Sequence, residues 1–272
     1  MTDRPDAPLT YRDAGVDIEA GEAAVERIKA HVRSTFRPEV LGDLGGFGGL
    51  FSLGNHGRKD PVLVASTDGV GTKSMVARLT GKYDTIGVDL VAMSADDIAV
   101  QGAEPLLFLD YISVGRLDPT MVDAIVEGVA EGCRQAGCAL IGGEMSEHPD
   151  LMAPGEFDLV GFAVGIVDRA AILPHGVRTG DHIIGFASPG LRSNGYSLAR
   201  RALIDRAGRD LDAPAWKGRS VSPSFATPRP ARMTTTSSWS WTCTGVAAPG
   251  SIVRRHISTW RAPREAVATP VM

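Results

Sequence analysis

Apolar and polar positions along the chain predict both helices and strands. After a candidate N-cap at Asp17, Val25, Ile28 and Val32 share one helical face, which indicates an amphipathic helix. Further helices are expected over residues 87–102, around residues 122–137 and over residues 196–207, and strands over residues 61–65, 106–114, 138–141, 159–167 and 183–187. This mixture without regular alternation predicts an α/β or mixed α+β chain, with a second domain starting near residue 172.

Residues 219–272 differ in composition from the rest of the chain. They contain eight Ser, eight Thr, six Pro and seven Arg, neither Lys nor Leu, and Glu265 as their one acidic residue. Residues 1–218 have a net charge of −10, whereas this tail has a net charge of +6. One interpretation is a natural disordered tail. The other is translation out of frame from a GC-rich gene, which the three Trp favour because disordered segments are usually poor in Trp.

Composition and charge argue against several classes of protein. The 272 residues, 43% of them apolar and 22% charged, are typical of a globular protein, and the net charge of −4 gives no reason to expect a nucleic-acid partner. A polar N-terminus and the lack of an apolar run of about 20 residues predict neither a secretory signal nor a membrane span, so we expect a cytoplasmic location. Cys133, Cys138 and Cys243 are expected to be free thiols, since they form neither a disulfide framework nor a zinc pattern.

The stretch S66-T67-D68-G69-V70-G71-T72-K73 follows an apolar strand and resembles a phosphate loop. It is not a Walker A loop, because Thr72 separates Gly71 from Lys73, and it lacks the third glycine of a dinucleotide-binding loop. A carboxylate, a glycine turn, a hydroxyl and a cation instead suit a Mg²⁺–nucleotide whose metal is held by Asp68. The alternative is an ordinary strand-to-helix turn with a solvated Lys73.

The predicted helix over residues 87–102 carries three carboxylates among apolar residues. Asp89 and Asp96 are seven residues apart and share a face, and Asp97 lies about a hundred degrees further round the helix. Together with Asp68 they are candidates to hold one or two Mg²⁺ ions. The alternative is a solvated helix face.

Three glycine-containing segments are weaker candidates for ligand contact. Residues 44–51 hold four glycines in five residues, which indicates a mobile loop or a close approach to a ligand. The stretch G142-G143-E144 places a carboxylate directly after a strand, and S193-N194-G195 precedes a helix, where N–H groups bind phosphate or Ser and Asn cap the helix. The histidines without a ligand or triad spacing, interpreted as surface or loop residues, are His148, His175 and His182.

Seven stretches in order carry a specific resemblance. They are T10-Y11-R12-D13-A14-G15-V16-D17, G45-G46-F47-G48, D68-G69-V70-G71-T72-K73, D84-T85-I86-G87-V88-D89-L90-V91-A92-M93, Q101-G102-A103-E104-P105-L106, G142-G143-E144 and S193-N194-G195-Y196-S197-L198. Over about residues 10–216 the chain strongly resembles the phosphoribosylformylglycinamidine cyclo-ligases, also called aminoimidazole ribonucleotide synthetases.

The resemblance implies a two-domain fold that uses ATP. After a flexible N-terminus (residues 1–9), it implies a complete ATP-binding and dimerisation domain over residues 10–171. A truncated substrate domain would follow over residues 172–218, before the tail. In the family's reaction, ATP phosphorylates the formyl amide oxygen of formylglycinamidine ribonucleotide, the amidine nitrogen attacks that carbon and phosphate leaves. ATP, Mg²⁺ and a homodimer are therefore expected.

The resemblance also implies roles for individual residues. The catalytic residues would be Asp68, Lys73 and Asp97, and the metal ligands Asp68, Asp97 and Asp89. ATP and its phosphates would be bound by Gly45, Gly46, Gly48, Gly69, Gly71, Thr72 and Glu144. The substrate would be bound by Ser193, Asn194 and Gly195.

The chain departs from the family pattern at three points. Asp96 stands where the family has Asn, Met145 where it has Thr, and the family's H-I-T-G-G-G type stretch does not occur after residue 218. Two alternatives to an active cyclo-ligase therefore stay open. One is a catalytically incompetent product of a frameshifted gene. The other is a different ATP phosphotransferase of the superfamily, of the thiamine-monophosphate kinase or selenophosphate synthetase type.

Overall fold

The computed structural model describes residues 10–45, 48–54, 56–181, 191 and 193–210, and the backbone of four short strands between residues 214 and 242. Its α-helices are α1 (Ile18–Arg33), α2 (Lys73–Thr80), α3 (Asp84–Val100), α4 (Pro119–Ala136) and α5 (Tyr196–Arg200), with a 3₁₀ turn η1 (Arg169–Ala171) and a π-helical segment η2 (Arg201–Arg206). Its strands are β1 (Val40–Leu41), β2 (Leu50–Phe51), β3 (Pro61–Gly69), β4 (Glu104–Val114), β5 (Ala139–Glu147), β6 (Phe157–Asp168), β7 (Pro214–Trp216), β8 (Arg219–Ser220), β9 (Arg232–Thr236) and β10 (Ser238–Thr242).

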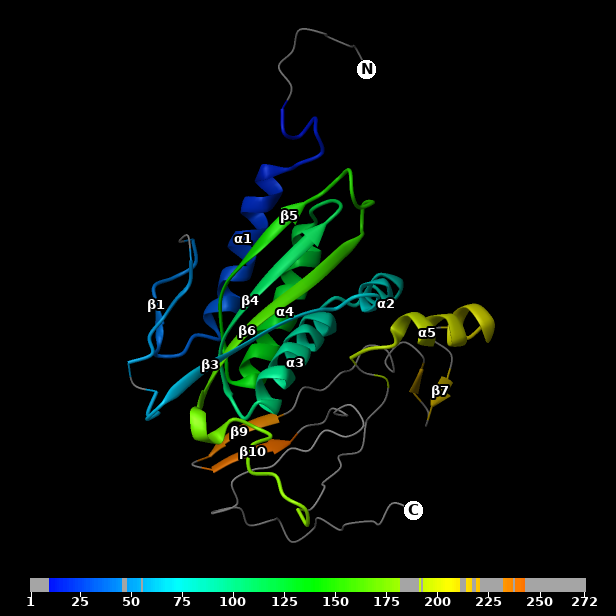
Figure 1. Cartoon of the computed structure of the whole chain (residues 1–272). Coiled ribbons are helices and arrows are strands. Elements are labelled where there is room, and N and C mark those ends of the chain that lie inside the picture. The colour runs from blue at the N-terminus through cyan, green and yellow to red at the C-terminus, as the bar shows by residue number, and fades with distance from the viewer. Residues whose placement is uncertain are drawn as a thin grey trace, which may run out of the picture.

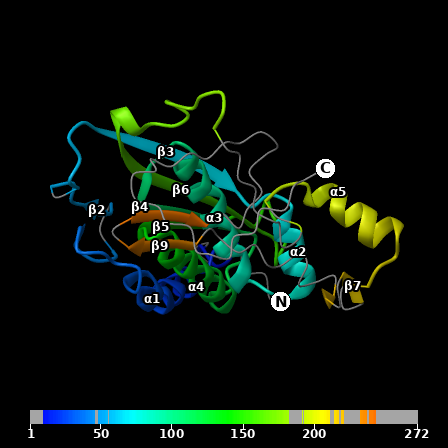
Figure 2. The same cartoon turned by 90° about the horizontal axis from the view of Figure 1, so that it is seen from below.

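A four-stranded sheet in the order β3-β6-β4-β5 forms the centre of the fold (Figure 1). β4 and β5 run parallel, whereas β6 pairs antiparallel with both β3 and β4. Helices α3 and α4 cover one face of this sheet, and α1 packs against α4 and β5 on the same side (Figure 2). The core lies between these helices and the sheet, and its largest fully buried side chains include Phe108, Leu90, Ile98, Ile125, Leu140 and Leu159.

Glycines let α3 and α4 approach each other closely. A Cβ atom on Gly128 would lie 1.9 Å from the carbonyl oxygen of Asp84, and one on Gly87 would lie 2.3 Å from that of Ile125. Both atoms would meet backbone, which cannot rotate away as a side chain can. The two helices therefore pack backbone to backbone, and this contact fixes α3 and its carboxylates against the sheet.

Most of the predicted elements are confirmed. α1 begins after Asp17, whose side chain accepts a hydrogen bond of 3.1 Å from the N–H of Ala20, and α4 ends at Ala136 with Gly137 as its C-cap in the left-handed conformation. Val25 is 41% exposed, so the buried stripe of α1 runs instead through Ala24 and Val32. The helix expected over residues 196–207 is observed as α5 and η2, and the strand expected over residues 183–187 lies outside the described residues.

Three predicted boundaries are wrong. The strand expected to end before Gly142 continues to Glu147, the strand expected over residues 61–65 runs on to Gly69, and α3 begins at Asp84 rather than at Gly87. The glycines do not end β5 because its backbone keeps pairing with β4 at Leu109 and beyond. Pairing with a neighbouring strand therefore overrides the local turn signal.

Within residues 219–272, β9 and β10 form an antiparallel pair. The expected domain boundaries and the nature of this tail stay predictions, and the expected flexible N-terminus at residues 1–9 lies outside the described residues. Among the helices that the structure describes, none combines the length and apolar character needed to cross a membrane.

Candidate functional site

The phosphate-loop motif forms the strand–turn–helix junction that its sequence predicts. β3 ends at Gly69, Gly71 adopts a φ of +55°, and α2 begins at Lys73 after its N-cap Thr72. The positive φ of Gly71 lies in the left-handed region, which favours glycine because it lacks a Cβ atom. Oδ1 of Asp68 accepts a hydrogen bond of 2.7 Å from the N–H of Gly69, which holds this carboxylate at the end of the strand.

Lys73 is buried beside a carboxylate of α3. Its ammonium group forms an ion pair with Asp89, and the two side chains are 7% and 3% exposed. Nζ of Lys73 also donates to Sδ of Met93 at 2.8 Å and lies 5.8 Å from the centroid of the Tyr196 ring. The alternative of a turn with a solvated lysine is therefore wrong, and Asp89 faces a cation of the protein rather than water.

Asp68 and Asp97 are the carboxylates that fit a Mg²⁺–nucleotide. Asp97 is exposed on α3, and its Oδ2 accepts a hydrogen bond of 2.6 Å from Oγ of Ser66. Ser66 and Asp68 are two residues apart on β3, so they share the face that α3 covers. Within the described part of the chain, no group of three or more His, Cys, Asp or Glu residues could hold an ion alone. Two carboxylates completed by phosphate oxygens and water are a usual protein environment for Mg²⁺.

A row of paired residues crosses the sheet beside this site. Gly161 of β6 pairs with Asp68 of β3 on one side and with Asp110 of β4 on the other, and Asp110 pairs with Gly143 of β5. Since paired residues on neighbouring strands point to the same face, Asp68 and Asp110 both lie on the helix-covered face. Oδ2 of Asp110 is buried without a hydrogen-bond partner among the described residues, and burial raises the pKa of this carboxyl to about 7.

Asp110 is a residue that the sequence prediction missed. Phe108 and Ile112, two residues to either side on β4, are both buried. Strand alternation places Asp110 on their face, so an inward-pointing carboxyl in an apolar strand is the signal that would have found it.

The stretch G142-G143-E144 lies inside β5 rather than after it. A Cβ atom on Gly143 would lie 1.8 Å from Oδ1 of Asp110, so this glycine leaves room for that carboxyl group. Glu144 is exposed on the opposite face, where its Oε1 accepts a hydrogen bond of 2.8 Å from the N–H of Met145. A role for Glu144 in nucleotide binding stays a prediction.

The predicted glycine loop is described in part. Gly45, with a φ of +107°, and Gly48 are exposed, whereas Gly46 lies outside the described residues. Gly49 then passes so close to β5 that a Cβ atom there would lie 2.6 Å from the carbonyl oxygen of Ile141. The role of this loop over a nucleotide stays a prediction.

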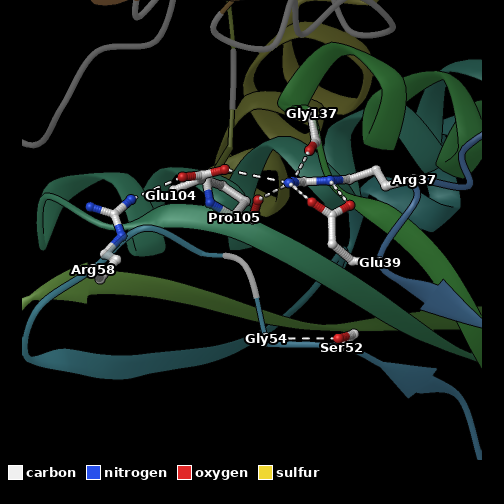
Figure 3. Close-up of polar contacts among 8 residues, drawn as sticks. All are labelled: Arg37, Glu39, Ser52, Gly54, Arg58, Glu104, Pro105 and Gly137. Carbon is white, nitrogen blue, oxygen red and sulfur yellow. Dashed lines mark hydrogen bonds and ion pairs between the residues drawn. The ribbon is translucent and has the colours of Figure 1, made fainter.

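A polar cluster fixes both ends of the segment that contains this loop (Figure 3). Arg37 lies before the loop, and its Nη2 is 3.3 Å from Oε1 of Glu39 and 3.6 Å from Oε1 of Glu104. Its Nη1 donates a hydrogen bond of 2.9 Å to the carbonyl oxygen of Gly137. Arg58, after the loop, lies 2.9 Å from the same Glu104 carboxylate. Glu104 therefore joins the two ends of the segment to the start of β4.

The predicted substrate segment lies beside the phosphate loop. Ser193 has a φ of +56°, a strained conformation for a residue with a Cβ atom, and Gly195 has a φ of +85° just before α5. One residue into α5, Oγ of Ser197 lies 2.9 Å from Oγ1 of Thr72. Substrate roles for Ser193, Asn194 and Gly195 stay predictions.

Cys133 and Cys138 are free and buried, as expected, and Cys243 lies outside the described residues. Burial raises the pKa of the Cys133 thiol well above its ordinary value, so this group is a core side chain rather than a nucleophile. His148 is half-buried, with a ring nitrogen 3.1 Å from Oγ of Ser113.

Residues 52–167 match a family described as AIR synthase related protein, N-terminal domain. A phosphoribosylformylglycinamidine cyclo-ligase of Anaeromyxobacter sp. (strain Fw109-5) is 57% identical over 221 residues, which cover 81% of this chain and 64% of that protein. A relative of the same name from Trichlorobacter lovleyi is 57% identical over 206 residues, which cover 75% of this chain and 59% of that protein. The chain thus spans less than two thirds of the length of these curated relatives.

Among solved structures, a thiamine-monophosphate kinase from Stenotrophomonas maltophilia K279a is similar with a TM-score of 0.49 and 21% identity, covering 72% of this chain and 56% of that one. E. coli HypE, a hydrogenase maturation protein, is similar with a TM-score of 0.41 and 18% identity, covering 54% and 44%.

Proposed function

Since this chain belongs to the phosphoribosylformylglycinamidine cyclo-ligase family, we propose that it carries the ATP site of an enzyme that forms aminoimidazole ribonucleotide in purine synthesis. The observation that carries this proposal is the arrangement of Asp68 and Asp97 around Ser66, next to the glycine turn of the phosphate loop. Phosphoryl transfer depends mostly on positioning and charge neutralisation, and two carboxylates beside a loop of backbone N–H groups suit that task.

In this proposal Asp68 and Asp97 hold the Mg²⁺ of MgATP. The metal, when bound, neutralises charge on the phosphates and aligns them for transfer to the formyl amide oxygen of formylglycinamidine ribonucleotide. Gly69, Gly71 and Thr72 form the turn that faces the phosphates. Asp89, which we expected as a third ligand, instead compensates the charge of Lys73 and acts from behind the loop.

We assign the substrate to the segment Ser193–Gly195 and the nucleotide base to the side of the glycine loop at Gly45, Gly46 and Gly48. A role for Glu144 in ATP binding rests on the family resemblance alone, because its side chain lies on the sheet face opposite to that of Asp68. The contact between Thr72 and Ser197 supports a shared site, because it joins the loop proposed for ATP to the segment proposed for the substrate.

A homodimer is part of the proposal. The face of the sheet opposite to α3 and α4 exposes apolar side chains from two neighbouring strands, with Leu63 57%, Phe162 40% and Val160 37% exposed. An apolar sheet face of this kind is typical of a surface that a partner covers. A second copy of the chain, pairing sheet against sheet, would bury it. A cytoplasmic location, and the lack of a nucleic-acid or membrane partner, stay predictions from the sequence.

A second candidate follows from the tail. Residues 219–272 hold neither Lys nor Leu, and the chain covers only 64% of the length of its relative from Anaeromyxobacter sp. (strain Fw109-5). If the tail replaces the family's second domain, the chain would bind MgATP without closing the ring. Resequencing the codons for residues 212–225 and translating the other frames tests this. A continuation rich in Leu and Asp, with a histidine followed by a glycine cluster, would establish a frameshift.

ADP release tests the enzymatic proposal directly. Purified chain is supplied with MgATP and either formylglycinamidine ribonucleotide or thiamine monophosphate. An active cyclo-ligase releases ADP with the first substrate and not with the second. Release of ADP with thiamine monophosphate would indicate a phosphotransferase of another class. MgATP binding without release under either condition identifies the incompetent form.

A further inference from the structure

Helix α2, which follows the phosphate loop, and helix α5 are joined by a cluster of buried contacts. Val76 of α2 and Tyr196 of α5 form a small hydrophobic cluster, with Leu191, Ala199 and Leu203 packed around it. This cluster is separate from the main core between the helices and the sheet. α5 lies beside α2 in both views of the fold (Figures 1 and 2).

The polar groups of the loop take part in the same contact. Thr72 is the N-cap residue of α2, yet its side chain makes no capping hydrogen bond, and its Oγ1 lies 2.9 Å from Oγ of Ser197. Nζ of Lys73 lies 5.8 Å from the centroid of the Tyr196 ring. The negative face of an aromatic ring attracts a cation at this distance. Two consecutive residues of the loop thus contact two consecutive residues of α5.

The burial of Lys73 limits what it can do for a ligand. Its ammonium group has three N–H donors, and Asp89, Met93 and the Tyr196 ring surround it. A lysine that turned toward a phosphate would break its buried ion pair with Asp89, which is costly because both side chains are shielded from water. The geometry therefore favours a lysine that keeps its buried contacts with Asp89 and Met93 and stabilises the loop without contacting the phosphates.

We propose that Tyr196 and Ser197 are positioning residues for the nucleotide site, which hold Lys73 and Thr72 so that the phosphate loop and the S-N-G-Y-S segment bind a nucleoside triphosphate as one unit. This inference rests on the proposed ATP site. It assigns Lys73 a structural role in the loop, whereas the motif suggests a direct contact with phosphate. The hydroxyl of Tyr196 also donates a hydrogen bond of 3.1 Å to the carbonyl oxygen of Leu191, but the proposed role depends on the ring rather than on this bond.

The test compares Tyr196→Ala, Tyr196→Phe and the matched control Leu198→Ala. Leu198 is 75% exposed on the same helix, so its truncation changes α5 without removing a buried side chain. Tyr196→Phe keeps the ring that faces Lys73. Amide hydrogen exchange of residues 70–80 is measured without nucleotide, and the Kd for MgATP is measured by calorimetry.

In Tyr196→Ala, exchange over residues 70–80 speeds up and the Kd for MgATP rises about tenfold, as the loss of a desolvated cation–ring contact implies. Tyr196→Phe stays within about twofold of the wild type, because it keeps that contact. A purely structural role would leave the Kd of Tyr196→Ala equal to that of Leu198→Ala, and this result would overturn the proposal.

The two arms separate this inference from the proposed function. If the wild type binds no MgATP, the ATP site itself fails, and the exchange arm alone decides the coupling. Faster exchange in Tyr196→Ala than in Leu198→Ala then supports a coupled loop, and equal exchange overturns it. A further check compares the single variants Thr72→Val and Ser197→Ala with the double variant Thr72→Val/Ser197→Ala. If the two hydroxyls act only through their contact with each other, the double variant speeds amide exchange no more than either single variant does.

Discussion

The ammonium group of Lys73 and the carboxylate of Asp89 form a buried ion pair between the first turn of α2 and the first half of α3. The pair ties the phosphate loop to the helix that also carries Asp97. A charge buried in this way is tolerated only with its partner, because its desolvation is otherwise uncompensated.

The Lys73→Met variant should therefore lose stability. Removing the cation breaks the buried ion pair with Asp89, and we expect a loss of about 3–5 kcal/mol in the free energy of unfolding, measured by urea denaturation. The control is Arg169→Met. It breaks the ion pair between Arg169 and Asp60, whose side chains are 67% and 59% exposed, respectively. That change should cost no more than about 1 kcal/mol. Equal losses in the two variants would contradict the buried pair.

Asp110 gives the fold a dependence on pH. The pKa of its carboxyl is raised by burial from 3.8 to about 7, so between these values the folded state keeps a proton that the unfolded state has lost. The free energy of unfolding should therefore fall as pH rises from about 4 to about 7, by up to ~4 kcal/mol. Urea denaturation across this range measures the slope.

The Asp110→Asn variant provides the comparison for that slope. An amide has nearly the shape of the carboxyl group and fits the space that Gly143 leaves, but it does not ionise. The variant should lose this part of the pH dependence and be more stable than the wild type above pH 7. A wild type and a variant with parallel pH profiles would show that Asp110 does not hold its proton in the fold.

The close approach of α3 and α4 predicts opposite effects for two glycine-to-alanine changes. Gly128→Ala places a Cβ atom 1.9 Å from the carbonyl oxygen of Asp84, so the helices must separate, at a cost of roughly 1–3 kcal/mol. Gly21→Ala in α1 meets nothing within 4 Å and should stabilise by up to about 1 kcal/mol, since alanine is the better helix former. Thermal unfolding distinguishes the two. A neutral Gly128→Ala would contradict the contact.

The open sheet face predicts the effect of a charge on assembly. Phe162→Asp places a carboxylate on the surface proposed for the homodimer, so analytical ultracentrifugation should show a shift from dimer to monomer. Leu151, 81% exposed in the loop between β5 and β6, offers the control, and Leu151→Asp should leave the dimer intact. A wild type that sediments as a monomer at micromolar concentration would contradict the proposed homodimer.

Local sequence signals predicted the junction at the phosphate loop, because its strand, glycine turn and helix are all encoded within a few residues. The end of α4 at Gly137 was predictable for the same reason. Local signals did not predict that β5 continues through Gly142 and Gly143, because this depends on pairing with the neighbouring strand β4. Contacts between residues far apart in the sequence, such as Lys73 with Tyr196, were also beyond a local pattern. Such contacts also place Lys73 and Asp89 in a buried ion pair with each other.

The most direct test of a metal–nucleotide site at Asp68 and Asp97 is a calorimetric titration of the chain with ATP, with Mg²⁺ present and then with Mg²⁺ removed by EDTA. Asp97→Asn and the exposed loop variant Asp150→Asn are titrated alongside it. We expect the wild type and Asp150→Asn to bind MgATP and to lose affinity with EDTA, and Asp97→Asn to bind MgATP at least about tenfold more weakly. Equal affinity in all three proteins, or binding that does not depend on Mg²⁺, would contradict a metal–nucleotide site at Asp68 and Asp97.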